Sequence, residues 1–280
     1  MKGKEMKGTV GKRLFVVMGL LLALFEASHV AQAEAAWSNT GQPTVLGTIS
    51  QESREILAGE TIVTGSYLAI GFADGLVGVS TYGLPALTAR GLRGVAFVPT
   101  ANVGLPKRMT LEQLQGLAAA GWDIASHLDN GGDCTQMPPE ELSSRLAASR
   151  NWLLRNGFVK GARIFGPPSQ KWAPELTPLA TQVGYEAVMV RTQRGGIVPQ
   201  NLALEYAGCA NKVALEQIAA AIETAKTTPG KLVILSFHDV VQSNPTGTQA
   251  DVQRLQAVLD LAVASGLPIV TVSDLMSGSD

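Results

Sequence analysis

The sequence predicts an α/β fold, a distorted (β/α) barrel of about seven parallel strands. Short apolar runs alternate along the chain with longer segments of helical periodicity. The runs are almost continuously apolar, as in parallel strands that helices cover on both faces. About seven such units in one domain favour a closed barrel. An open doubly wound sheet is the alternative, and it is disfavoured because no glycine-rich phosphate-binding sequence follows the first strand.

The elements follow one another in a regular order. Thr110 is expected to cap a helix, because Gln113 lies three residues later and completes a capping box. Pro138 and Pro139, followed by two glutamates, mark another helix start. The expected strands are 67–72, 94–98, a strand around 124, 163–165, 187–190, 231–237 and 269–272, and further helices are expected at 82–89, 175–183, 213–225 and 250–264.

The N-terminal segment has the pattern of a signal peptide. A basic stretch precedes an unbroken apolar run at 14–25, and Ala31-Gln32-Ala33 provides a cleavage site. The apolar run is shorter than the roughly 20 residues that a membrane-spanning helix needs. We therefore expect a signal peptide at 1–33, an N-terminal lead-in at 34–66 and the barrel domain at 67–280. The protein would then be exported, periplasmic or secreted, with no stable membrane span after leader cleavage; a retained N-terminal anchor is the alternative.

The charge composition of the chain limits the classes of partner that it can be expected to bind. Without the leader the chain keeps 17 basic and 21 acidic residues, a net charge of −4, and it has no basic cluster. Nucleic acid is therefore excluded as an expected partner. In an oxidising compartment Cys134 and Cys209 either form a disulfide bond or remain two separate buried thiols.

Outside the leader the chain has only two histidines. His127 and His238 each end a predicted hydrophobic strand. Histidine is the residue most often used for proton transfer and metal binding near neutral pH. In a barrel the functional site lies at the carboxyl ends of the strands. Asp74 and Pro167 also follow predicted strands, so these four residues are expected at one site.

Six short segments between residues 65 and 278 have a characteristic order. They are Gly-Phe-Ala-Asp-Gly at 71–75, Ala-Phe-Val-Pro-Thr at 96–100, the run ending in His127 at 121–127, Phe-Gly-Pro-Pro at 165–168, the strand and histidine within 232–240, and 266–273. As an ordered set they resemble the polysaccharide deacetylase family. Members of this family are metal-dependent carbohydrate esterases that remove N- or O-acetyl groups from sugars.

The resemblance implies a metal site and an acid. A divalent metal, with zinc as the expected ion, would bind to Asp74 and His127, and Asp133 could supply a third ligand from the following loop. His238 would be the general acid that protonates the leaving amine. Plainer roles compete with each of these. Asp74 could cap a helix, Asp133 could be solvated, and either histidine could be a satisfied residue at a strand end.

The resemblance also implies a substrate groove. Pro167 and Pro168 would shape its wall, and Trp172 would stack on a sugar ring. The alternative for Trp172 is a loop residue without contact to substrate. The expected partner is an acetylated polysaccharide or oligosaccharide.

The departures from the family pattern concern the chemistry. Ala73 stands where the family has its general base, and Gly131 replaces a second metal-binding histidine. Gly166 replaces the arginine that steadies the base. General base assistance is typically worth about 10²- to 10⁴-fold in rate. The sequence therefore indicates a divergent member with a degenerate active site.

Three functions remain open from the sequence. The chain is an exported deacetylase-like hydrolase acting on N- or O-acetyl groups of a glycan with metal assistance, in which Asp129, Asp133 or a metal-bound hydroxide replaces the base. Alternatively, it is a catalytically inactive member that binds glycan or a cell-wall partner. A hydrolase of different specificity on the same barrel is the third, because a fold does not fix a function.

Overall fold

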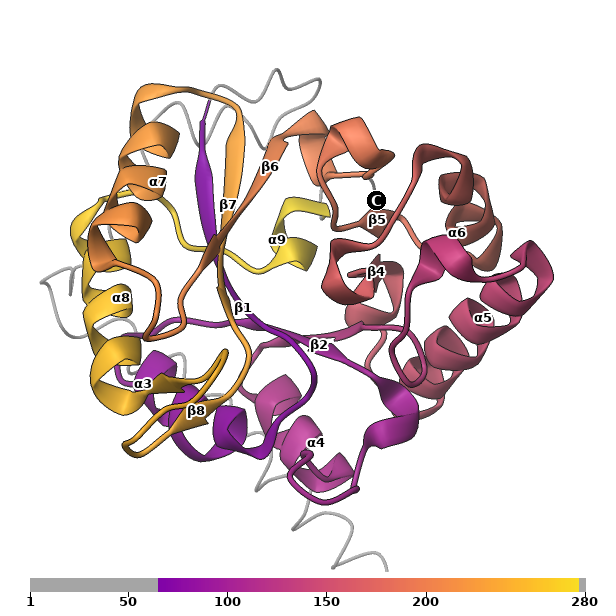
Figure 1. Cartoon of the computed structure of the whole chain (residues 1–280), viewed down its shortest axis with the longest axis horizontal. Coiled ribbons are helices and arrows are strands. Elements are labelled where there is room, and N and C mark those ends of the chain that lie inside the picture. Colours follow the sequence, from indigo (N-terminus) through magenta and orange to yellow (C-terminus); the bar gives the residue numbers. More distant parts are fainter. Residues whose placement is uncertain (1–64, 277–280) are drawn as a thin grey trace, which may run out of the picture. The chain divides into compact units, whose positions relative to one another are not determined.

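The computed structural model describes residues 65–276, and these residues form the predicted sheet (Figure 1). Seven strands, all parallel, lie in the order β5-β4-β3-β2-β1-β7-β6. They are β1 (Tyr67–Phe72), β2 (Val95–Val98), β3 (Asp123–Ser126), β4 (Ile164–Phe165), β5 (Ala187–Val188), β6 (Ala203–Gly208) and β7 (Lys231–Phe237). The fold class and the number of strands are confirmed.

The sheet curls but its two edge strands do not pair. Among residues 65–276, β5 and β6 share no ladder, so the barrel is open between them. Tyr206 on β6 spans this opening, because its hydroxyl donates a hydrogen bond of 2.5 Å to the carbonyl of Met189, just after β5. The observed shape is therefore a half-closed barrel rather than a continuous ring.

Two predicted details of the strands change. The structure has a strand that the sequence did not predict, β6, at one edge of the sheet. The expected strand at 269–272 is wrong. Only Ile269 forms a bridge, to Leu68. Thr271 then donates its amide to Asp274 Oδ2 at 2.9 Å, and helix α9 (Val272–Met276) begins. The free edge of β1 is short at this point, because β2 pairs with β1 only from Gly71 onward.

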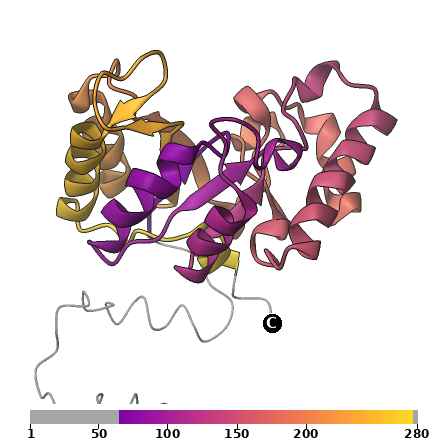
Figure 2. The same cartoon turned by 90° about the horizontal axis from the view of Figure 1, so that it is seen from below.

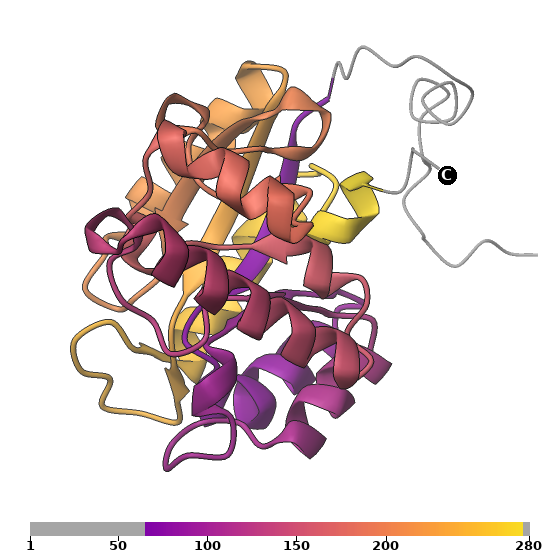
Figure 3. The same ribbon diagram turned by 90° about the vertical axis from the view of Figure 1, so that its right-hand side faces the viewer.

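Helices cover the outer face of the sheet. Figure 2 and Figure 3 show them around the curved sheet, with α5 and α6 on the side that faces the viewer in Figure 3. The capping box at Thr110 and Gln113 is confirmed, with bonds of 3.2 and 2.8 Å. The helices are α3 (Leu84–Thr88), α4 (Leu111–Ala119), α5 (Pro139–Arg155), α6 (Thr177–Val183), α7 (Leu215–Thr227) and α8 (Val252–Ala264), and a small ribbon joins β8 (Val240–Val241) to β9 (Ala250–Asp251).

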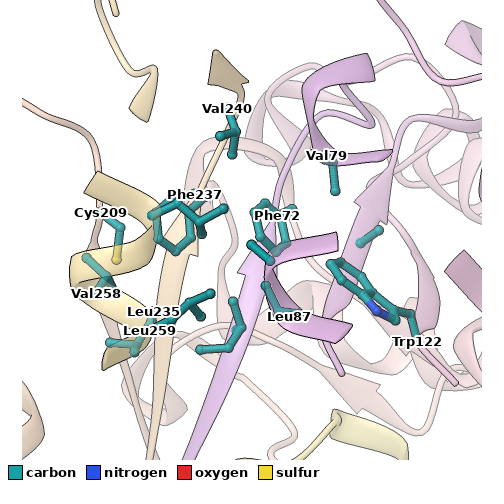
Figure 4. Packing of buried hydrophobic residues seen from close by; sticks show 14 of the residues in the cluster. Phe72, Val79, Leu87, Trp122, Cys209, Leu235, Phe237, Val240, Val258 and Leu259 are labelled. Atoms are coloured by element: carbon teal, nitrogen blue, oxygen red, sulfur yellow. The ribbon is translucent and has the colours of Figure 1, made fainter. Parts of the chain in front are cut away.

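The alternation of side chains along β1 separates two parts of the core. Phe72 points toward the helices and stacks on Trp122 and Phe237, with ring centroids 5.4 and 5.3 Å away (Figure 4). The opposite face of β1 carries small residues. A Cβ on Gly71 would lie 2.7 Å from Ile234 on β7. Small residues on this face let the strands curl around a filled interior.

A buried carboxylate holds the C-terminal helix. Asp123, at the start of β3, accepts hydrogen bonds from the amide and hydroxyl of Ser273 at 2.8 and 2.6 Å. Burial raises the pKa of Asp123 above its ordinary value. Arg93 pairs with Asp274 on the same helix at 3.0 Å. These contacts fix α9 against the amino-terminal side of the sheet.

The structure contradicts the disulfide alternative for the cysteines. Cys134 and Cys209 are free, buried thiols. They lie in different parts of the core, because Cys134 packs with Leu142 of α5, whereas Cys209 packs in the cluster that includes Val258 of α8. Burial raises the pKa of each thiol to about 12. Both are therefore packing residues.

The expected signal peptide, and all of the lead-in except residues 65 and 66, lie outside the described residues. The domain limits and the export of the protein stay predictions. Within residues 65–276 no helix combines the length and apolar character needed to cross a membrane.

Replacing Asp123 by alanine is expected to destabilise the domain by about 1–3 kcal/mol, because Ser273 would keep a buried amide and hydroxyl without an acceptor. Chemical denaturation of both proteins measures the difference. Asp260→Ala is the control. It removes an exposed ion pair with Arg90 and should cost at most about 1 kcal/mol. Equal losses in the two variants would contradict the role given to Asp123.

Candidate active site

Parallel pairing brings the predicted site residues to one edge of the sheet. Asp74 lies two residues after β1, His127 follows β3 directly, and His238 follows β7. Phe72 pairs with Phe237, and Ser126 pairs with Phe165, so the strands end at matching heights. The carboxyl ends of β4, β3, β1 and β7 therefore carry the candidate site.

His127 and Asp74 are neighbours. The distance from His127 Nε2 to Asp74 Oδ1 is 3.8 Å. On its other side the His127 ring donates a hydrogen bond from Nδ1 to the carbonyl of Gly166 at 2.6 Å. Because a carbonyl only accepts, the proton of the neutral ring lies on Nδ1, and the lone pair of Nε2 is directed toward Asp74. A metal-binding histidine is commonly held in this way.

The surroundings keep His127 neutral. Burial lowers the pKa of His127, and the neighbouring His238 and Arg108 act in the same direction. Asp74 and the bond to Gly166 oppose this shift but do not cancel it. The neutral form is also the one that binds a ligand through Nε2.

The turn that carries Asp74 is strained and buttressed. Asp74 has φ of 71°, a left-handed conformation that is uncommon for residues other than glycine, and Gly75 follows with φ of 61°. Arg108 donates from Nη1 to the carbonyl of Asp74, and the amide of Met109 donates to Gly75 at 2.9 Å. Strained residues of this kind cluster at functional sites.

The structure does not bring Asp133 to Asp74 and His127. Asp133 Oδ1 accepts from the amide and the hydroxyl of Thr135 at 3.0 and 2.6 Å. These bonds lower the pKa of Asp133. Its other oxygen lies 3.9 Å from Lys171 Nζ. Asp133 therefore caps a short turn instead of completing a ligand set.

Asp129, the other carboxylate of this loop, is also engaged. Arg145 of α5 donates from Nε to Asp129 Oδ1 at 2.7 Å and from Nη2 to the carbonyl of Gly131 at 2.7 Å. The loop in which the family has its second histidine is thus fastened to α5.

The donor set falls short of a zinc site. Within residues 65–276 no group of three or more histidine, cysteine, aspartate or glutamate side chains is placed to hold a metal ion. Catalytic zinc usually keeps three protein ligands. Asp74 and His127 fit two of them, whereas the guanidinium of Arg108 brings a positive charge to the same place. The described residues do not fit the metal that the family resemblance implies.

Phe97 occupies the space at position 166. A Cβ added to Gly166 would lie 2.6 Å from Cδ1 of Phe97. The ring of Phe97 also packs against His127, with centroids 6.2 Å apart. The arginine that the family carries at this position cannot be accommodated in the present packing.

The structure places the residues of the predicted groove differently from the expectation. Pro167 and Pro168 are buried, and they lead into Ser169 and Gln170, which have φ of 52° and 57°. The expectation that Trp172 stacks on a sugar is wrong.

Trp172 is 4% exposed and packs its ring against Phe165, with centroids 5.3 Å apart. Its Nε1 donates to the hydroxyl of Thr177 at 3.2 Å. The ring therefore belongs to the core cluster that includes Ala180 of α6. Sequence reasoning missed this, because the loop around Trp172 has no periodic pattern that would show its burial.

The comparisons with known proteins agree with the segments that suggested the family. Residues 62–188 match the sequence model of the polysaccharide deacetylase family. The family resemblance is confirmed. No curated protein matches the sequence.

Solved structures of deacetylases and esterases share the fold. The chitin deacetylase from Colletotrichum lindemuthianum is 13% identical, with a TM-score of 0.55, over 76% of this chain and 88% of that chain. The Xyl-CE4 domain of a xylanase from the hindgut metagenome of Trinervitermes trinervoides is 20% identical, with a TM-score of 0.54, over 76% and 90%.

A family 4 acetyl xylan esterase from Clostridium thermocellum was solved in complex with a cobalt ion. It is 20% identical, with a TM-score of 0.53, over 75% of this chain and 90% of that chain. At these identities the likeness concerns the fold.

Gly166→Ala is expected to destabilise the domain by about 1–3 kcal/mol, because its Cβ would overlap the ring of Phe97. The double variant with Phe97→Leu should lose less than the sum of the two single variants, since the smaller side chain leaves room for the Cβ. Thermal unfolding of the four proteins tests this. Additive losses would show that the two positions do not compete for the same space.

Proposed function

We propose that this domain is exported and binds an acetylated polysaccharide or oligosaccharide at the site of Asp74, His127 and His238, without efficient hydrolysis. The observation that carries the proposal is Ala73 at the position of the general base. Neither carboxylate of the loop after His127 replaces it, because Asp129 and Asp133 are held by Arg145 and Thr135. Removing base assistance typically lowers a rate by about 10²- to 10⁴-fold and leaves binding groups in place.

The coordinated packing around the missing groups supports this proposal. Phe97 fills the space at Gly166, and Arg145 fastens the loop at Gly131. A site damaged by one recent substitution would keep room for the lost side chains. Here the ring of Phe97 has closed over position 166, whereas a Cβ on Gly131 would meet open space.

The groups that remain suit an acetylated sugar. His238 is partly exposed, and within residues 65–276 its ring makes no hydrogen bond. It can therefore bond to a ligand. The structural neighbours are named for chitin and acetyl xylan, both acetylated glycans. These names support the ligand class.

A metal-assisted deacetylase-like hydrolase is the second candidate. The arrangement of His127 favours it, because Nδ1 bonds to Gly166 and Nε2 faces Asp74 at 3.8 Å. The ion would be a divalent metal, with zinc expected, and ligands other than described side chains would have to complete its shell. His238 would then be the acid that protonates the leaving amine.

The proposal predicts binding without turnover. An N-acetylated chito-oligosaccharide and an acetylated xylo-oligosaccharide should be tested by calorimetry and by acetate release. We expect saturable binding of at least one and acetate release no faster than in buffer. His238→Ala should weaken binding about fivefold, the loss of roughly one hydrogen bond. Acetate release that is proportional to protein concentration and absent in His127→Ala would establish the second candidate instead.

Metal content separates the two candidates independently. Residues 34–280 are purified without chelators or a histidine tag and are analysed by elemental mass spectrometry. With two protein ligands in the described site we expect far less than one zinc ion per chain, also after zinc is added and excess is removed. Near-stoichiometric metal in the wild type, lost in His127→Ala, would contradict the proposal.

A further inference from the structure

We propose that Arg108 is a ligand-binding residue of this site and that its guanidinium holds the carbonyl oxygen of an acetyl group without a metal. The inference rests on the proposed function and names the part of the ligand that the site recognises. Its starting point is that the described side chains provide too few ligands for a metal ion. Asp74 and His127 remain from that set, and Arg108 is the cation beside them.

The chain places Arg108 firmly. It lies between β2 and α4 and forms an antiparallel bridge with Leu76. The amide of Val77 donates to the carbonyl of Lys107 at 3.0 Å, and the amide of Met109 donates to the carbonyl of Gly75 at 2.9 Å. Backbone bonds on both sides therefore hold Arg108 against the turn that carries Asp74.

The guanidinium has donors to spare. An arginine side chain has five N–H donors in a planar fork. Among residues 65–276 the guanidinium of Arg108 uses Nη1 for the carbonyl of Asp74 and makes no ion pair or other hydrogen bond. Arg108 is partly buried and partly open to solvent. Its unused donors can therefore bind an oxygen of a ligand that enters beside Asp74.

The charge of the site favours a neutral acceptor. Arg108 and Asp74 contribute opposite charges to the site. A carboxylate or phosphate group would meet the carboxylate of Asp74, which is 38% exposed on its side chain. An acetyl carbonyl brings a partial negative charge to the guanidinium and no net charge to Asp74. The amide or ester oxygen of an acetylated sugar fits these conditions.

Calorimetric titration in the presence of EDTA tests the proposal. The ligand is an N-acetylated chito-oligosaccharide, and the same oligosaccharide with free amines is the comparison. We expect wild type to bind the acetylated form in EDTA. Arg108→Met should weaken this binding about 10- to 100-fold, as expected when a charge-assisted hydrogen bond is lost. Arg108→Lys should retain part of it, because lysine keeps the charge but not the fork.

Lys107→Met is the matched control. Lys107 is the exposed neighbour on the same segment, and within the described residues its side chain has no ion pair. This variant should bind as wild type does. Thermal unfolding shows whether Arg108→Met has loosened the Asp74 turn. If it has, the Arg108→Lys variant is the deciding measurement. Weaker binding by this variant than by wild type, at an unchanged melting temperature, supports a contact between Arg108 and the ligand.

Three results would overturn the inference. They are equal affinity of Arg108→Met and wild type, equal losses in the Arg108 and Lys107 variants, and binding by wild type only after a metal is added. Failure of the proposed function looks different, because wild type would then bind no acetylated oligosaccharide with or without metal.

Discussion

The bond between His127 and the carbonyl of Gly166 is the interaction on which the site depends. It joins the ends of β3 and β4, fixes the tautomer of the ring and directs Nε2 toward Asp74. It can form only because parallel pairing brings Ser126 beside Phe165 and leaves the next residue of each strand at the edge. The bond uses the backbone of residue 166 and no side chain there. The geometry of the histidine therefore needs no side chain at position 166.

The changes around this bond are linked by packing. Phe97 lies against both His127 and the missing Cβ of Gly166, so one ring closes the space of the arginine and walls one side of the histidine. Arg145 fastens the loop in which a second histidine is absent. Such contacts rigidify the remaining residues. At position 166 a side chain is unfavourable, because the ring of Phe97 leaves no room for a Cβ.

The sequence was sufficient for elements with a strong periodic pattern and for residues at strand ends. β1, β7 and the capped helix α4 follow their patterns closely. The edge strand β6 was missed because its sequence mixes apolar and charged residues, and it faces solvent on one edge. The apolar run at 269–272 was misjudged, because only a short free edge of β1 is available to it and Asp274 caps a helix immediately afterwards.

Within the site, the order of the motifs located Asp74, His127 and His238. It did not show which local hydrogen bonds engage the other candidate residues. Asp133 and Trp172 have residue types that suit a metal and a sugar. Local bonds to Thr135 and Thr177 use their polar atoms instead. Arg108, in contrast, belongs to no recognisable motif. Only the structure shows that its backbone pairs with Leu76 and that its side chain reaches the carbonyl of Asp74. A cation fixed in this way needs no set of metal ligands to hold it. Under the proposal, it gives this fold a means to hold an acetyl oxygen at a site where Ala73 stands at the position of the base.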